Sequence, residues 1–119
     1  MNGIKYLLDT NIIIGMYEQT PAVLDLFNVN QVTIEQCAYS SITRMELLGF
    51  PNIQQNEINI ISALLKKMSQ LGINRTIEDK TINLKQQHRI KLPDAIILAT
   101  AITNQIELLT LDKKLSNKL

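Results

Sequence analysis

Four carboxylates stand at positions where an α/β fold brings distant side chains together. Asp9 and Asp112 follow two short apolar runs, whereas Glu46 and Asp94 fall near the start of two helical patterns. In a parallel sheet with helical crossovers, the carboxyl ends of the strands and the amino ends of the helices lie at the same edge. The four acids are therefore expected to converge on one site, although they are far apart in the sequence.

The chemistry of such a site is that of a hard divalent cation. Four carboxylates in one cleft repel one another and raise each other's pKa values, and a divalent cation removes that repulsion. Oxygen ligands favour Mg²⁺ or Mn²⁺, and zinc is disfavoured because the single Cys37 and the single His88 provide no ligand cluster. We therefore predict a Mg²⁺ (or Mn²⁺) site, which can lower the pKa of a bound water.

The first acid needs a rigid support, and an apolar strand precedes it. Four of the five residues 4–8 are apolar, which is typical of a central strand covered on both faces. Helices are expected over residues 11–18, weakened by Gly15, and over 21–28, with Thr20 as N-cap and Pro21 in the first turn. The next strand is expected over residues 37–42, where Cys37 would be a small buried hydrophobe.

The helix that carries the second acid allows a structural interpretation beside the functional one. It is expected to begin with Thr43 as its cap and to end before Gly49, with Met45 and Leu47 in the core. Glu46 stands three residues after Thr43, which is the spacing of a capping box. Glu46 therefore either completes a cap or binds the metal.

The second half of the sequence continues the alternation of helix and strand. We predict a long helix over residues 52–71 closed by Gly72, a strand over 73–77, a polar helix over 78–92, a buried helix over 95–103 and a strand over 106–110. Asp94 also suits the first turn of its helix, and Asp112 could cap a last short helix. The alternation indicates the α/β class with a parallel sheet and right-handed crossovers.

Composition limits the setting and the partners. A chain of 119 residues with 45% hydrophobic residues suits one globular domain. The absence of a long apolar run and of a signal-like N-terminus predicts a cytoplasmic protein without a membrane partner. The net charge is +1, but sequestering four acids leaves seven against twelve basic residues, a surface that is permissive for RNA.

Basic residues are candidates for holding a nucleic acid by its backbone. Aromatic residues make up only 4%, so base stacking is not expected to dominate. Each candidate can equally be part of an exposed helical face, and the same holds for His88. The predicted RNA contacts are Lys85, Arg89, Lys91 and Arg44.

The sequence resembles the PIN domain nucleases, and within them the VapC toxins of type II toxin–antitoxin pairs. The resemblance rests on four segments in the order of the family, namely residues 7–11 (LLDTN), 41–47 (SITRMEL), 92–99 (LPDAIILA) and 109–112 (LTLD). It implies a single PIN domain over residues 1–119, built as a three-layer α/β/α sandwich around a mostly parallel sheet of four or five strands. It also implies magnesium-dependent cleavage of RNA, a homodimer and a cognate antitoxin.

The resemblance also assigns roles to individual residues. It implies that the metal is bound by four acids and that two polar residues support them, in the order Asp9, Glu46, Asp94 and Asp112 for the metal and Thr110 and Asn11 for the support. Family members often carry a further acid and an aromatic residue where this chain has Lys114 and Leu115. The fourth carboxylate therefore rests on Asp112 alone, and the number of metal ions stays open.

Other classes fit the sequence less well. A haloacid-dehalogenase-like phosphatase needs a second Asp two residues after the first, where this chain has Asn11. A dinucleotide-binding domain needs a glycine-rich first turn, which residues 9–12 do not offer. The remaining alternative is a non-catalytic PIN-like module that binds RNA or a protein partner.

Overall fold

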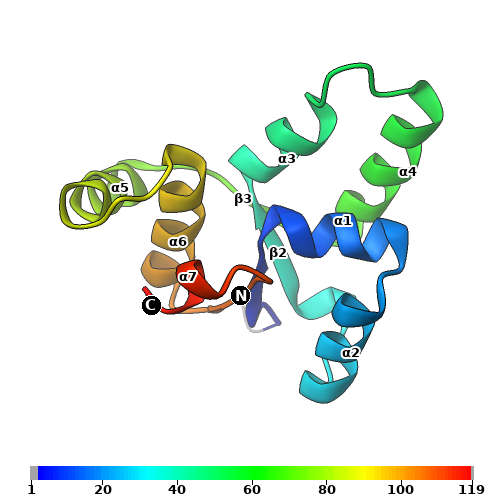
Figure 1. The fold of residues 1–119 in the computed structure, drawn as a ribbon, viewed down its shortest axis with the longest axis horizontal. Helices are drawn as coiled ribbons and strands as arrows, with labels where there is room; N and C mark the ends of the chain where they lie inside the picture. The colour runs from blue at the N-terminus through cyan, green and yellow to red at the C-terminus, as the bar shows by residue number, and fades with distance from the viewer. Residues whose placement is uncertain (1–2, 119) are drawn as a thin grey trace.

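Parallel strands form the centre of the molecule, with a layer of helices on each face (Figure 1). The computed structural model describes residues 3–118. Over that range the sheet has four strands in the order β3-β2-β1-β4, and each neighbouring pair is parallel. The strands are β1 (Tyr6–Leu8), β2 (Cys37–Ser40), β3 (Ser69–Leu71) and β4 (Glu107–Leu109). The predicted three-layer α/β/α class is confirmed.

The helices divide between the two faces of the sheet. One face is covered by α1 (Thr10–Glu18), α2 (Pro21–Asn30) and α4 (Gln55–Lys66). The other is covered by α5 (Arg75–Gln87), α6 (Leu92–Asn104) and the short α7 (Lys113–Ser116). Helix α3 (Ser41–Leu48) continues directly from β2 and contacts α1, α4 and α6, so it closes the carboxyl edge of the sheet.

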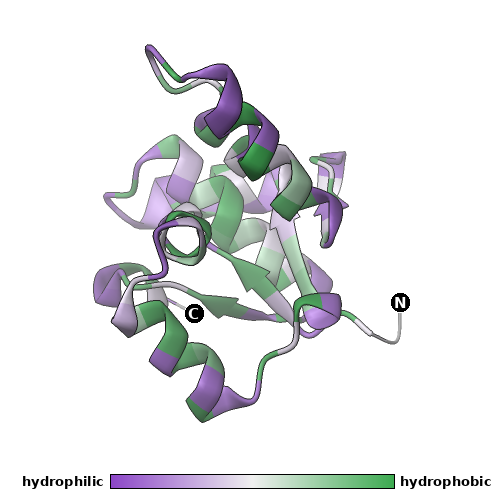
Figure 2. Cartoon of the chain, turned by 90° about the vertical axis from the view of Figure 1, so that its right-hand side faces the viewer, coloured by the Kyte–Doolittle hydropathy of each residue, from purple (hydrophilic) through white to green (hydrophobic). Residues whose placement is uncertain are grey.

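The strands separate two hydrophobic cores. Because successive side chains of a strand point to opposite faces, Leu8 and Leu109 pack with α1 and α4, whereas Leu7 and Leu108 pack with α5 and α6. Both Leu7 and Leu8 are fully buried. Figure 2 shows apolar residues along the strands at the centre of the molecule. This burial on both faces explains why the central strand β1 is continuously apolar instead of alternating.

The strand order creates a topological switch point at the carboxyl end of β1. From β1 the chain builds the sheet toward β2 and β3, and it later returns to place β4 on the opposite side of β1. Neighbouring crossovers therefore diverge above β1 and β4, and such a divergence leaves a crevice suited to ligands. Asp9 and Thr110 follow these two strands, and the Asp9 amide donates to the Leu109 carbonyl at 3.0 Å.

The helix predicted over residues 52–71 is confirmed for residues 55–66, but the strand predicted over 73–77 is wrong. The helix there, α4, ends at Lys66, and residues 69–71 form the edge strand β3, which pairs with β2 from Ala38↔Ser69 onward. The apolar spacing in the sequence gives no sign of where the helix ends. A short edge strand is specified mainly by main-chain pairing, so its side chains need no distinctive pattern. The strand predicted over 73–77 is replaced by the start of α5, where the Asn74 side chain accepts from the Ile77 amide at 2.9 Å.

The capping prediction for α3 is also wrong. Ser40 is the N-cap, and its hydroxyl accepts a hydrogen bond from the Ile42 amide at 3.3 Å. Thr43 therefore lies inside the helix and is fully buried, and Glu46 lies beyond the first turn, where it completes no capping box. Met45, expected in the core, is 55% exposed. A serine at the end of β2 starts the helix three residues earlier than the Thr43 pattern indicated.

The remaining elements agree with their predictions apart from their ends. Helices α1, α2 and α6 and strand β4 lie where expected, and α6 is buried along most of its length. The polar helix α5 ends at Gln87, so its predicted extension to residue 92 is wrong. Thr20 is the N-cap of α2, although its side chain makes no capping hydrogen bond.

Gly15 is the point of closest approach between α1 and α2. A Cβ atom at this buried position would clash with the Val23 side chain and would lie 2.9 Å from the Thr20 hydroxyl. The Thr20 amide donates to the Gly15 carbonyl at 2.9 Å, so the turn between the helices is fixed against this residue. The lower helix propensity of glycine is therefore offset by tighter packing of α2.

We predict that Gly15→Ala destabilises the protein by about 1–3 kcal/mol, because overpacking outweighs a gain in helix propensity of about 1 kcal/mol. Urea unfolding at equilibrium measures the change. Val23→Ala removes the clashing methyl groups, so the double variant should be more stable than the sum of the two single effects. Additive effects would contradict the packing explanation.

Candidate active site

Asp9 is a buried carboxylate with three hydrogen-bond donors around it. Its side chain is 5% exposed and stands at the N-cap of α1. One oxygen accepts from the Thr10 amide at 2.8 Å, and the other accepts from the Thr110 hydroxyl at 2.6 Å and the Asn11 side-chain amide at 3.4 Å. These donors, together with the helix dipole, hold the carboxylate in a fixed orientation.

Thr110 and Asn11 join the ends of β1 and β4. The Thr110 hydroxyl donates to Asp9 and accepts from the Asp112 amide at 3.0 Å. Asn11 extends this link, because its side-chain oxygen accepts from the Leu111 amide at 3.3 Å. The supporting position predicted for both residues is therefore the position they occupy.

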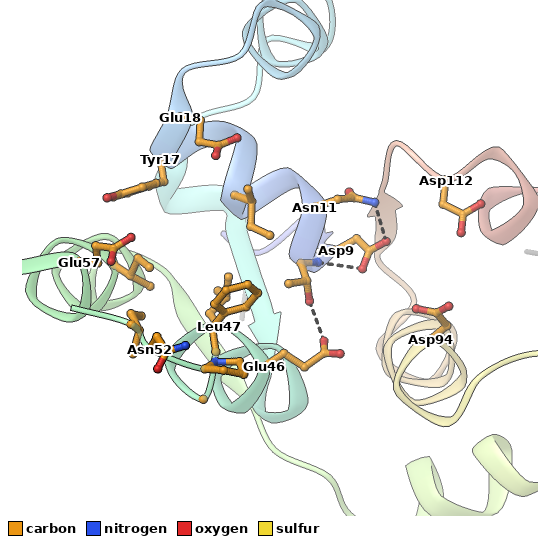
Figure 3. Close-up of a pocket in the computed structure, with 17 residues that line it drawn as sticks. Asp9, Asn11, Tyr17, Glu18, Glu46, Leu47, Asn52, Glu57, Asp94 and Asp112 are labelled. Atoms are coloured by element: carbon orange, nitrogen blue, oxygen red, sulfur yellow. Dashed lines mark hydrogen bonds between the residues drawn. The ribbon is translucent and has the colours of Figure 1, made fainter. Parts of the chain in front are cut away.

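Glu46 reaches the site from α3. Its side chain is exposed, and one carboxylate oxygen accepts from the Thr10 hydroxyl at 2.9 Å. Because Thr10 directly follows Asp9, this hydrogen bond brings the Glu46 carboxylate next to the first acid (Figure 3). Its second oxygen remains for another partner.

Asp94 lies in the first turn of α6 and responds to all the other acids. Partial burial is the largest cause that raises the pKa of Asp94, followed by repulsion from Asp9, Asp112 and Glu46. Lys91 opposes these effects and lowers the pKa. Asp94 is therefore within electrostatic reach of the other three acids.

Asp112 has the capping role that its position allowed. Its Oδ1 atom accepts from the amides of Lys114 at 3.0 Å and Leu115 at 3.3 Å, and it begins α7. Both capping bonds use the same oxygen, so Oδ2 is available to the site. In this chain the cap and the site share one side chain.

The four carboxylates line one cavity of about 740 Å³. In Figure 3 the side chains of Asp9 and Asp94 point toward the same space, with Asp112 beside it and Glu46 on the other side of Asp9. Away from these four acids the wall of the cavity is mainly apolar, and it includes Ile14, Tyr17, Leu47, Phe50, Pro51, Ile53 and Ile61. Two further carboxylates, Glu18 and Glu57, also line this wall. The sequence patterns did not indicate this wall. Phe50, which is 69% exposed after the glycine that ends α3, was the signal that could have indicated it.

The donor set fits Mg²⁺ or Mn²⁺ by its chemistry, because it consists of carboxylates from four different elements. Among residues 3–118, no three Asp, Glu, His or Cys side chains are close enough to hold one ion as they stand. Asp9 is held through both of its oxygens, whereas the exposed Glu46 and Asp112 are each held through one carboxylate oxygen. Closing the set around one ion therefore requires the free oxygens of the exposed acids to move toward Asp9.

None of the four predicted RNA contacts lines the cavity. All four basic side chains are exposed, and Lys91 is near enough to Asp94 to influence its pKa. Lys85 donates from its ammonium group to the Ile90 carbonyl at 3.0 Å. Arg44 and Arg89 lie on α3 and on the loop before α6, so their contact with RNA stays a prediction.

Two residues set aside in the sequence occupy unremarkable positions. Cys37 is fully buried, and burial is the main cause that raises the pKa of its thiol to about 11. It is a core residue, as predicted. His88 is exposed and follows the last residue of α5.

Throughout the part of the chain that the structure describes, no helix has the length and apolar composition needed to cross a membrane.

Comparison with known proteins identifies the family. Residues 6–118 match the model of the PIN domain family. No curated protein matches the sequence. A chain of a toxin–antitoxin complex from Klebsiella pneumoniae is 32% identical, with a TM-score of 0.78, and the match covers 92% of this chain and 88% of that one.

Two further solved structures are similar. A chain of VapBC-1 from nontypeable Haemophilus influenzae is 27% identical, with a TM-score of 0.74 and coverage of 97% of this chain and 91% of that one. A chain of VapBC2 from Rickettsia felis, solved with a DNA fragment from their promoter, is 17% identical, with a TM-score of 0.78 and coverage of 98% and 93%. At this identity the Rickettsia protein shows the fold alone. The resemblance to VapC-type toxins is confirmed, and the chain belongs to the PIN domain family.

Proposed function

We propose that this protein is a Mg²⁺- or Mn²⁺-dependent endoribonuclease and the toxin of a type II toxin–antitoxin pair. The observation that carries the proposal is the convergence of four carboxylates, from the ends of β1 and β4 and from α3 and α6, on one cavity. Without a cation, a cluster of this kind is unfavourable for folding, because like charges in one cavity repel one another. A cluster with this cost is expected where a cation and its chemistry require it.

Each residue of the site has a stated task in this proposal. Asp9, Glu46, Asp94 and Asp112 hold the cation, which when bound activates water and stabilises the charge on a phosphodiester. Thr110 and Asn11 hold Asp9 and the loop that carries Asp112 in register. Because Asp9 is held rigidly, the other three acids can adjust around it when a substrate binds, and the geometry of the site is kept.

The exposed basic residues give the RNA backbone a place to bind beside this acidic centre. Lys91 begins α6, three residues before Asp94, and its charge acts on that carboxylate. A phosphate bound by Lys91 would lie next to the acids, and the positive charge of Lys91 would offset their repulsion of the phosphate. We propose that Lys85, Arg89 and Arg44 extend the contact through non-specific phosphate binding.

The partner that we propose is a protein antitoxin. The similar chains from Klebsiella pneumoniae and Haemophilus influenzae come from toxin–antitoxin and VapBC complexes. This chain leaves Phe50 and Ile60 more than half exposed, which gives a protein partner apolar area to cover. The homodimer implied by the resemblance is part of the same proposal.

We expect purified protein to cleave RNA with Mg²⁺ or Mn²⁺, and Asp9→Asn and Asp94→Asn each to reduce the rate at least about 100-fold. This is the upper range for lost supporting contacts, and direct ligands should exceed it. Gel analysis of a defined RNA measures the rate. Asp25→Asn, an exposed acid of α2 outside the cavity, is the matched control and should keep wild-type activity.

The same assay separates the proposal from its alternative. Equal cleavage by all preparations would show a contaminating nuclease. RNA binding without cleavage, together with no binding of Mn²⁺ by the wild type, would identify a non-catalytic binding module. Loss of activity in Asp25→Asn would show that acids outside the cavity are equally important.

The raised pKa of Asp94 also predicts how the stability of the protein depends on pH. Because its pKa is raised, Asp94 binds a proton more readily in the folded chain than in the unfolded chain. Its contribution to stability is therefore greatest below its ordinary pKa of about 4 and is lost as the pH rises through the raised value. Asp94→Asn should raise the melting temperature at pH 7 in EDTA and should flatten the decline above pH 4.

Thermal unfolding of the wild type and Asp94→Asn between pH 4 and pH 8 measures this difference. Adding Mg²⁺ at about 100 times its dissociation constant should stabilise the wild type by about 2.7 kcal/mol and should stabilise Asp94→Asn much less. Parallel curves for the two proteins in EDTA would contradict repulsion at Asp94.

A further inference from the structure

Two threonines from separate helices meet beneath the Glu46 carboxylate. Thr10 is the first residue of α1, and Thr43 lies in α3 with no exposed surface. Their hydroxyl oxygens are 3.2 Å apart, and the Thr10 hydroxyl is 2.9 Å from Glu46 Oε1. Neither threonine has a task in the proposed chemistry described above.

The protons of these hydroxyls have one consistent arrangement. An ionised carboxylate accepts hydrogen bonds and cannot donate, so the single proton of Thr10 points to Glu46. The 3.2 Å contact between the two hydroxyl oxygens is then made by the proton of Thr43. Thr43 therefore donates to Thr10 and Thr10 donates to Glu46, and each bond favours the other by polarisation.

This arrangement solves a positioning problem. Glu46 is exposed, has several rotatable bonds and belongs to a helix on a different part of the chain from Asp9. Thr10 occupies one oxygen of Glu46, and its own amide donates to Asp9 at 2.8 Å. One residue thus contacts two of the acids, and its backbone is fixed by α1.

We infer that Thr10, supported by the buried Thr43, is a positioning residue that sets the orientation of Glu46 for cation binding. The inference rests on the proposed metal site and adds to it a hydroxyl relay from the core. By occupying Oε1, the relay leaves Oε2 for the cation. Removing the Thr10 hydroxyl releases Glu46 to solvent without changing any of the four carboxylates.

The test is the affinity of the whole chain for Mn²⁺, measured by isothermal titration calorimetry without RNA. Thr10→Val keeps the shape of the side chain and removes the hydroxyl, and it should weaken Mn²⁺ binding by about 10–100-fold. Thr10→Ser keeps the hydroxyl and should bind almost as tightly as the wild type. Thr10→Ala provides a second variant without the hydroxyl in case valine disturbs the start of α1.

A mutant cycle with Glu46→Gln tests whether Thr10 acts through Glu46. In the Glu46→Gln background, Thr10→Val should produce little further loss of affinity. Thr81→Val is the control, because Thr81 is buried like Thr43 but donates to the Ile77 carbonyl on the far side of the sheet. Its Mn²⁺ affinity should not change.

The outcomes separate this inference from the function on which it rests. Unchanged Mn²⁺ binding by Thr10→Val and Thr10→Ala, or equal losses in both backgrounds of the cycle, would overturn the positioning role while the metal site stands. Absence of Mn²⁺ binding by the wild type would overturn both. A loss shared by Thr10→Ser would also overturn the role of the hydroxyl.

Discussion

The burial of one carboxylate at the end of β1 is the constraint on which the rest of the site depends. An ionised group in this position requires donors, and Asp9 obtains them from the start of α1 and from Thr110 after β4. To supply them, β4 must pair with β1 and α1 must begin immediately after the strand. The strand order, the switch point and the orientation of Asp9 therefore all serve to provide hydrogen-bond donors to this buried carboxylate.

The other acids have a different physical character. Glu46, Asp94 and Asp112 are partly or largely exposed. Glu46 and Asp94 lie on helices, and Asp112 lies between β4 and α7. Repulsion among these carboxylates opposes their convergence on the cavity. Solvent screens this repulsion because the three side chains are partly or largely exposed. The site thus combines a rigid acid with three that can respond to charge. This combination suits a centre that must bind a cation and a polyanion in the same place.

Much of this arrangement could be predicted from the sequence, and the failures have identifiable causes. The strand before Asp9 and the buried helix that contains Asp94 are each marked by a run of apolar residues in the sequence. Both predictions are confirmed. The edge strand at residues 69–71 was missed because its three residues carry no pattern of their own, and main-chain pairing to β2 decides their conformation. The start of α3 was misplaced because Ser40, Ser41 and Thr43 are all acceptable caps, and tertiary burial of Thr43 decides among them. Side-chain convergence on the apolar cavity wall depends on how α1, α3 and α4 pack, which no local pattern encodes.

The shared use of Asp112 restricts what this position can hold. Asparagine would retain the N-cap of α7 but would remove a negative charge from the cavity, whereas glutamate would retain the charge but is a poorer cap. Helix α7 in turn places Leu115 in the core beside α6. The side-chain length and the charge of residue 112 therefore meet two separate structural requirements, one for the start of the last helix and one for the acidic cavity. Aspartate satisfies both demands.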